Sequence, residues 1–109
     1  MDEITDVFIT AEDGDWLAEF ARGLVGDGLA ACGNIIPGVR SIYTWEGKVE
    51  DGSEALLVLH TRKDLVHRII ERANEEHPDE TPQVLAVPVT EANPGYRNWL
   101  VEATGGTTR

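Results

Sequence analysis

The sequence predicts an α+β domain of the ferredoxin-like type: a four-stranded antiparallel sheet in βαββαβ order, two helices on one sheet face, and a short C-terminal helix. Short runs of β-branched and aromatic residues alternate with segments whose apolar residues recur every three or four positions. The two middle strands are separated by a short turn, so a hairpin joins two βαβ units. The 109 residues form one domain, placed at residues 1–104, with a flexible tail at 105–109.

The first strand is predicted at residues 6–10, where the sequence reads DVFIT. Residues 11–31 then change to a helical period, and Asp13 or Asp15 can cap the start of this helix. The glycines near its end suit a left-handed C-terminal residue. Its apolar face consists of Trp16, Leu17, Phe20, Ala21, Leu24 and Val25.

The second and third strands are predicted at residues 34–48 and 53–61. Pro37–Gly38 interrupts the second strand, because proline cannot donate a hydrogen bond to the ladder. Two turn signals follow. We place the reversal of the hairpin at Glu46–Gly47 and an irregularity of the bulge type at Asp51–Gly52.

The second helix is predicted over residues 61–77, and Thr61 with Asp64 has the spacing of a capping box. Pro78 disfavours helical geometry at the preceding residue, so the helix should end at about His77. The apolar stripe of this helix is Leu65, Val66, Ile69, Ile70 and Ala73.

Residues 83–89 are predicted as a final core strand, and residues 93–103 as the closing helix. Asn93 suits the N-cap position and Pro94 the first helical position. The apolar side of this helix carries Tyr96, Trp99, Leu100 and Ala103. We interpret Trp16 and Trp99 as core residues.

One face of such a sheet is left bare by the two main helices. The two hairpin strands are long and carry aromatic residues, so their ends should overhang the domain. An overhanging apolar hairpin in a water-soluble protein requires a partner surface, which predicts a homo-oligomer.

Composition excludes several classes of partner. Twenty acidic residues against nine basic ones give a net charge of −11, which argues against nucleic acid and against anionic membranes. No apolar run approaches the roughly 20 residues of a membrane-spanning helix, and we expect a cytoplasmic protein. The single cysteine, Cys32, rules out an internal disulfide and is interpreted as a small hydrophobic residue.

Three stretches resemble the CutA family of divalent-cation tolerance proteins: LAACGNIIPGVRSIYTWEGKVE, EEHPDETP and NPGYRNWL. The resemblance runs from about residue 7 to residue 99. It implies a ferredoxin-like domain that assembles as a compact homotrimer through its long hairpin strands. It also implies a cytoplasmic protein, with copper or other divalent ions bound in some members.

The metal ligands of the family transfer only in part. Some bacterial members use a cysteine at the end of the first strand and two adjacent histidines at the end of the second helix. Here Ile9 stands at the cysteine position, while Glu76 and His77 stand at the histidine positions. The candidate metal ligands are therefore His77, Glu76 and Glu80, completed by carboxylates of a neighbouring subunit. Without the thiolate the site is harder, and copper and zinc are candidate ions, neither of them obligatory.

Two alternatives stay open for these residues. The EEHPDETP stretch also has the composition of a solvated helix end. Separately, Tyr43, Trp45, Lys48 and His77 are candidate residues of a cleft between subunits, which would make the protein a small-molecule sensor similar to the PII trimers, or a structural trimer. The competing interpretation of the two aromatic residues is packing in the trimer core.

An enzymatic function is not supported by any motif. The sequence has no nucleophile elbow, no phosphate-binding loop and no metalloprotease motif. Acylphosphatases share this fold class, but they need an arginine in a phosphate-cradling loop after the first strand. Here that loop reads TAEDGD and would repel a phosphoryl group. The sequence thus predicts a non-enzymatic protein.

Overall fold

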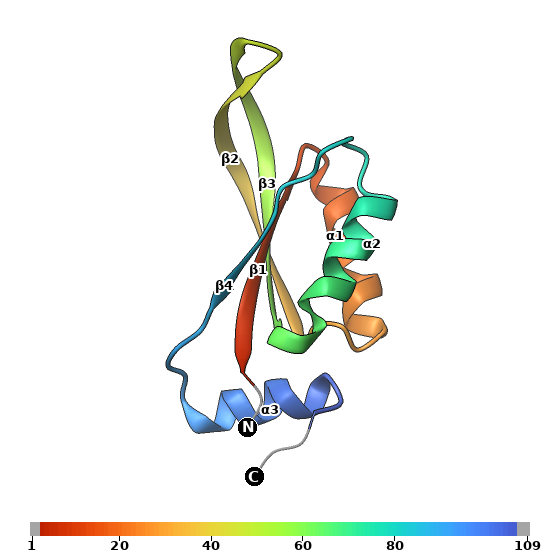
Figure 1. Ribbon diagram of the computed structural model, residues 1–109, viewed down its shortest axis with the longest axis vertical. Coiled ribbons are helices and arrows are strands. Elements are labelled where there is room, and N and C mark those ends of the chain that lie inside the picture. The colour runs from red at the N-terminus through yellow and green to blue at the C-terminus, as the bar shows by residue number, and fades with distance from the viewer. Residues whose placement is uncertain (1–2, 107–109) are drawn as a thin grey trace.

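Figure 1 shows the computed structural model; the structure describes residues 3–106. The elements follow the predicted order and confirm the ferredoxin-like fold class, with three helices against one antiparallel sheet. They are β1 (Ile4–Ala11), α1 (Gly14–Gly26), β2 (Cys32–Trp45), β3 (Lys48–Arg62), a 3₁₀ turn (Lys63–Leu65), α2 (Val66–Glu76), β4 (Val84–Pro88) and α3 (Pro94–Ala103).

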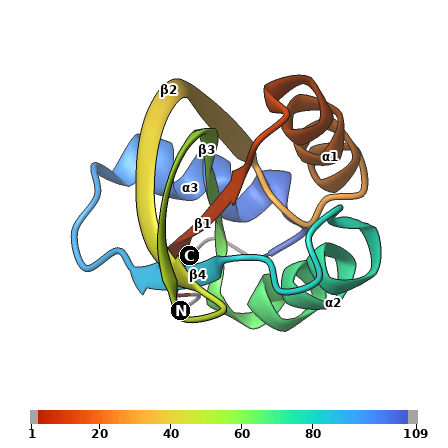
Figure 2. The ribbon, with the colours of Figure 1, turned by 90° about the horizontal axis from the view of Figure 1, so that it is seen from above.

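The sheet has the order β2-β3-β1-β4, so β1 lies in the interior and β4 forms an edge. Helices α1 and α2 lie side by side on one face, while α3 crosses the end of the sheet opposite the hairpin tip (Figures 1 and 2). Alternate residues of β1 and β3 point towards α1 and α2. This core contains Val7, Ile9, Ala11, Leu17, Phe20, Leu24, Leu57, Leu59, Ile69 and Ala73.

Asp13 is the N-cap of α1. Its carboxylate oxygen accepts hydrogen bonds from the backbone N–H groups of Asp15 (2.9 Å) and Trp16 (3.2 Å). Two of the four orphan donors of the helix start are thereby satisfied. Of the two capping candidates in the sequence, Asp13 has this role.

The hairpin reverses at Glu46–Gly47, as predicted. Glu46 has φ 49° and Gly47 has φ 79°, the left-handed pair that a tight two-residue hairpin turn requires. The predicted bulge at Asp51–Gly52 is wrong, because these two residues pair regularly with Ile42 and Ser41. An Asp-Gly pair inside a long, continuous ladder can simply stay extended.

The register shift of this hairpin lies between Ile36 and Val39 instead. Pro37 has no N–H to give to the ladder, and Gly38 has φ 73°. The interruption that the sequence indicated at Pro37–Gly38 is therefore the irregular point of β2.

The predicted start of the second helix is wrong. Thr61 is the penultimate residue of β3, and its buried hydroxyl donates to the Leu29 carbonyl (2.6 Å) rather than capping a helix. Asp64 accepts hydrogen bonds from Arg62 instead. The helix ends as predicted, because His77 is extended (φ −65°, ψ 137°) before Pro78.

The strand predicted at residues 83–89 is β4, and its description as a core strand needs correction. At the sheet edge, Leu85 and Val87 pair with Phe8 and Asp6 on the face that α1 and α2 do not cover. Leu85 is 57% exposed in the single chain. Only Val84 of this strand packs against the core.

Helix α3 begins at Pro94 with Asn93 in the N-cap position, although the Asn93 side chain makes no capping hydrogen bond. Trp99 is 47% exposed, so its predicted place in the core is wrong for the single chain. Because α3 lies across the sheet end, it buries Leu100 and Val101 against Ile4 instead.

The predicted tail at 105–109 is described only in its first two residues. Gly105 and Gly106 donate backbone hydrogen bonds to Glu102 (3.0 Å) and Val101 (2.8 Å), which closes the end of α3. Residues 107–109 lie outside the described part of the chain.

Replacing Gly47 by Ala tests the position of the turn. Because Gly47 has φ 79°, the substitution should lower the free energy of unfolding by about 1–2 kcal/mol. Gly52→Ala is the matched control, since open space surrounds it and it needs no left-handed backbone. Urea denaturation of both variants measures the difference; equal losses would contradict a turn at Glu46–Gly47.

Candidate functional site

A pocket of about 610 Å³ lies where the β2–β3 hairpin meets the segment between α2 and β4. In Figure 1 this segment leaves the end of α2 and runs across the hairpin strands. We call the pocket the acidic pocket; its lining includes Glu12, Tyr43, Trp45, Glu54, Asp79 and Glu80. Three separate parts of the chain thus supply it: the loop after β1, the hairpin, and residues 78–83.

The charge of the acidic pocket is one-sided. Four carboxylates line it, and none of its described lining residues is Lys, Arg or His. Of these carboxylates, those of Glu12, Glu54 and Glu80 take part in no ion pair with any residue in the 3–106 range. An uncompensated group of like charges attracts cations and repels phosphate or carboxylate ligands.

His77 lies behind this pocket rather than in it, and its side chain has no exposed surface. Its Nε2–H donates to the Thr10 carbonyl (2.8 Å), and its Nδ1 accepts from the Asp79 backbone N–H (2.9 Å). The Asp79 carboxylate lies 3.9 Å from Nδ1, beyond hydrogen-bond distance. The arrangement fixes the tautomer that carries its proton on Nε2.

A metal ion binds to an imidazole nitrogen through its lone pair. In His77 the Nδ1 lone pair is used by the Asp79 N–H, and Nε2 carries a proton shared with Thr10. His77 could ligate only by giving up a buried hydrogen bond, whose loss leaves an unsatisfied polar group.

Glu76 is paired with a basic residue of its own helix. Its carboxylate accepts a hydrogen bond from Arg72, one turn earlier on α2, and Arg72 also bonds Asp27 (2.8 Å) after α1. These two carboxylates, Glu76 first, raise the pKa of Arg72. The trio ties the end of α1 to α2 on the outer surface of the helices.

The three predicted metal ligands are therefore not brought together within one chain. His77 is enclosed, Glu76 is paired with Arg72, and Glu80 lines the acidic pocket. Between residues 3 and 106, no three His, Cys, Asp or Glu side chains are grouped closely enough to hold a metal ion. A copper site of the histidine–thiolate kind does not fit these residues, and the donors available at the pocket are oxygens.

The predicted cleft residues are divided in the same way. Tyr43 and Trp45 line the acidic pocket, and both are about half exposed. Lys48 lies at the tip of the hairpin opposite Trp45 and does not line it. Sequence reasoning missed Glu12 and Glu54; the acidic TAEDGD loop was the one signal that pointed to Glu12.

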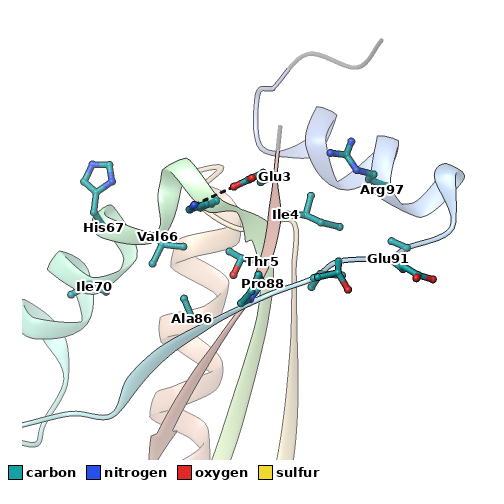
Figure 3. Close-up of a pocket in the computed structure, with 14 residues that line it drawn as sticks. Glu3, Ile4, Thr5, Val66, His67, Ile70, Ala86, Pro88, Glu91 and Arg97 are labelled. Carbon is teal, nitrogen blue, oxygen red and sulfur yellow. Dashed lines mark ion pairs between the residues drawn. The ribbon is translucent and has the colours of Figure 1, made fainter. Parts of the chain in front are cut away.

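A larger pocket, of about 1190 Å³, lies between α2, β4 and the start of α3 (Figure 3). Its apolar lining residues include Val66, Ile70 and Pro88. Charges of both signs surround it, among them an exposed ion pair between Lys63 and Glu3 (3.2 Å). Because its lining has charges of both signs, this pocket does not indicate one chemical class of ligand.

A polar cluster occupies the uncovered sheet face beneath α3. His60 Nδ1–H donates to the Asp6 carboxylate (2.6 Å), and His60 Nε2 lies 2.8 Å from Asn34 Oδ1. Burial raises the pKa of Tyr96, and the neighbouring Cys32 adds to the shift through its charge and a hydrogen bond. Both imidazole nitrogens have a polar neighbour here, and no buried side-chain N or O atom of the described residues lacks a hydrogen-bond partner.

Residues 5–103 match the family described as CutA1 divalent ion tolerance protein. The chain belongs to this family. The resemblance in its motifs is thereby confirmed, over nearly the whole domain.

The relatives extend over several kingdoms. The chain is 39% identical to "Divalent-cation tolerance protein CutA" of Thermus thermophilus over 96% of its own length and all of the relative's. The structure of that protein superposes with a TM-score of 0.88. "Protein CutA, chloroplastic" of Arabidopsis thaliana is 39% identical over 90% of this chain and 54% of the relative, so the chain spans about half the length of the plant CutA protein.

The compartment is not fixed by these comparisons. A CutA structure from Archaeoglobus fulgidus, 28% identical with a TM-score of 0.89 over 93% of this chain and 98% of that one, is described as periplasmic. Among residues 3–106, no helix combines the length and the apolar character needed to cross a membrane. A cytoplasmic location stays a prediction.

Replacing His77 by Ala tests whether this residue is structural. The loss of two buried hydrogen bonds and of the ring packed against Trp16 should lower the free energy of unfolding by about 2–4 kcal/mol. His67→Ala is the control, because His67 is an exposed histidine in the first turn of α2. Urea denaturation at one fixed protein concentration compares them, and equal stability of both variants would refute this role.

Proposed function

We propose that the protein is a non-enzymatic homotrimer of divalent-cation tolerance, and that it binds a divalent cation in the acidic pocket with oxygen ligands completed by a neighbouring subunit. The observation that carries the proposal is the acidic pocket itself, which is lined by four carboxylates and by no basic residue among the described lining. Membership of the divalent ion tolerance family gives the physiological context.

A neighbouring subunit is needed because one chain does not bring enough ligating side chains together. No three of the described carboxylates and imidazoles converge on one point in a single chain. A divalent cation of the hard or borderline type takes four or more ligands. The acidic pocket lies along the side of the overhanging hairpin, where a second chain can bring the missing oxygens.

Exposed apolar residues support the assembly. Ile42 is 67% exposed and Val49 is 75% exposed on the hairpin, and Leu85 and Val87 are exposed on the edge strand β4. Exposed apolar surface of this kind marks a protein interface. The number of three subunits is taken from the family resemblance.

A small organic ligand is the second candidate for the same pocket. Its volume of about 610 Å³ lies within the usual range of small-molecule sites, and Tyr43 and Trp45 provide aromatic walls. Because the pocket is acidic, such a ligand would be cationic. A nucleotide of the kind bound by PII proteins would be repelled by Glu12, Glu54 and Glu80.

The assembly is tested by light scattering after size-exclusion chromatography. The wild type should have three times the 12.0 kDa mass of one chain. Ile42→Glu/Val49→Glu places charges on the hairpin and should shift the mass towards one chain. Val25→Glu, an exposed apolar position on α1, should leave the mass unchanged. A monomeric wild type would refute the trimer.

Cation binding is tested by calorimetry with zinc and with copper(II). Asp79→Asn/Glu80→Gln should weaken zinc binding about tenfold or more, because two pocket oxygens lose their charge. Glu71→Gln/Glu75→Gln on α2 makes the same change in net charge away from the pocket and should leave the affinity nearly unchanged. Equal weakening by both pairs would mean that overall charge, and not this pocket, attracts the ion.

A further inference from the structure

The enclosed side chain of His77 joins three parts of the chain. It follows the last turn of α2, bonds the carbonyl of Thr10 at the end of β1, and accepts from Asp79 in the segment that leads to β4. Figure 1 shows this segment passing from the end of α2 towards the sheet.

Both hydrogen-bond partners of the His77 ring line the acidic pocket. Thr10 belongs to one wall and Asp79 to another, and His77 itself lies behind them. The bond to the Asp79 N–H spans two residues and has the form of an Asx turn, with an imidazole nitrogen in place of a carboxylate oxygen. It sets the direction in which the backbone leaves α2, and hence the place of Asp79 and Glu80.

The ring orientation is fixed by packing. The indole of Trp16 contacts the imidazole of His77 at a centroid distance of 5.0 Å and an interplanar angle of 65°. The same indole also stacks on the ring of Phe20, at a centroid distance of 5.0 Å and an interplanar angle of 12°. Trp16 packs against the main hydrophobic core. The position of the acidic pocket is thus tied through His77 to α1.

We infer that His77 is a positioning residue of the acidic pocket, which holds Asp79 and Glu80 in place for the cation without binding the cation itself. The inference rests on the proposed function for the cation-binding part. It differs from the ligand role that the family pattern implies for this position, because both ring nitrogens are used by the backbone.

Three substitutions separate the two hydrogen bonds. In His77→Asn the amide oxygen can replace Nδ1 and accept from the Asp79 N–H, as in an ordinary Asx turn. In His77→Gln the amide N–H can replace Nε2 and donate to Thr10, but no acceptor remains for Asp79. His77→Ala removes both bonds, and His67→Ala, in the first turn of α2, is the control.

The experiment measures two quantities for each protein: hydrogen exchange of the Asp79 amide by NMR, and zinc affinity by calorimetry. Asp79 should be protected in the wild type, His77→Asn and His67→Ala, and should exchange rapidly in His77→Gln and His77→Ala. Zinc affinity should follow the same division, with about a tenfold loss in the two variants that free Asp79. The imidazole ¹⁵N shifts of His77 should not move when zinc is added.

Two outcomes would overturn the inference. If His77→Asn protects Asp79 and still loses zinc as strongly as His77→Ala, or if the ¹⁵N shifts of His77 move with zinc, the residue is a ligand. If every variant binds zinc like the wild type although Asp79 exchanges rapidly, His77 does not position the site. Absence of zinc binding by the wild type would refute the proposed function, while Asp79 exchange would still decide whether His77 fixes this segment.

Discussion

Burial of the sheet on one face only is the constraint on which the other features depend. Side chains alternate along a strand, so Val7 and Ile9 of β1 face α1 and α2, while Asp6 and Phe8 face away from them. Because no helix of the described chain lies on that second face except α3 at its end, exposed apolar residues collect there and on the edge strand β4. The hairpin extends beyond both layers and has a similar surface. The single chain therefore folds around one core and leaves a second apolar surface exposed.

The two ends of the sheet satisfy their polar groups differently. Beneath α3, His60 bonds Asp6 and lies against Asn34, so the polar groups of the uncovered face bond each other. At the hairpin end, the carboxylates of Glu12, Glu54 and Glu80 face a pocket without compensating charges among the described residues. The candidate site is placed at this second end because its carboxylates have no compensating charge among the described residues.

The sequence predicted the fold because its signals were local. Alternation, helical spacing, the Glu46–Gly47 turn and the helix stop before Pro78 each depend on a few neighbouring residues. The wrong predictions concern residues whose environment is set by tertiary contacts. Thr61 has a good capping spacing, but β3 continues through it, and Trp99 lies on a plausible apolar stripe that α3 turns outward. For the site, the sequence pointed to the end of the second helix. It could not show that the His77 ring bonds Thr10, a residue 67 positions earlier, or that Glu12 and Glu54 line the same pocket as Glu80.

The acidity of the whole protein does not by itself explain the pocket. With a net charge of −11 many carboxylates must lie on the surface, and arginines neutralise several of them. Arg40 binds Asp51 through two hydrogen bonds and holds the pKa of that carboxyl below its ordinary value, and Arg72 binds both Asp27 and Glu76. Basic residues are scarce in this chain, and those in the described part lie on the three helices, in the 3₁₀ turn and on strands β2 and β3. The acidic pocket receives none among its described residues, so its uncompensated carboxylates attract cations.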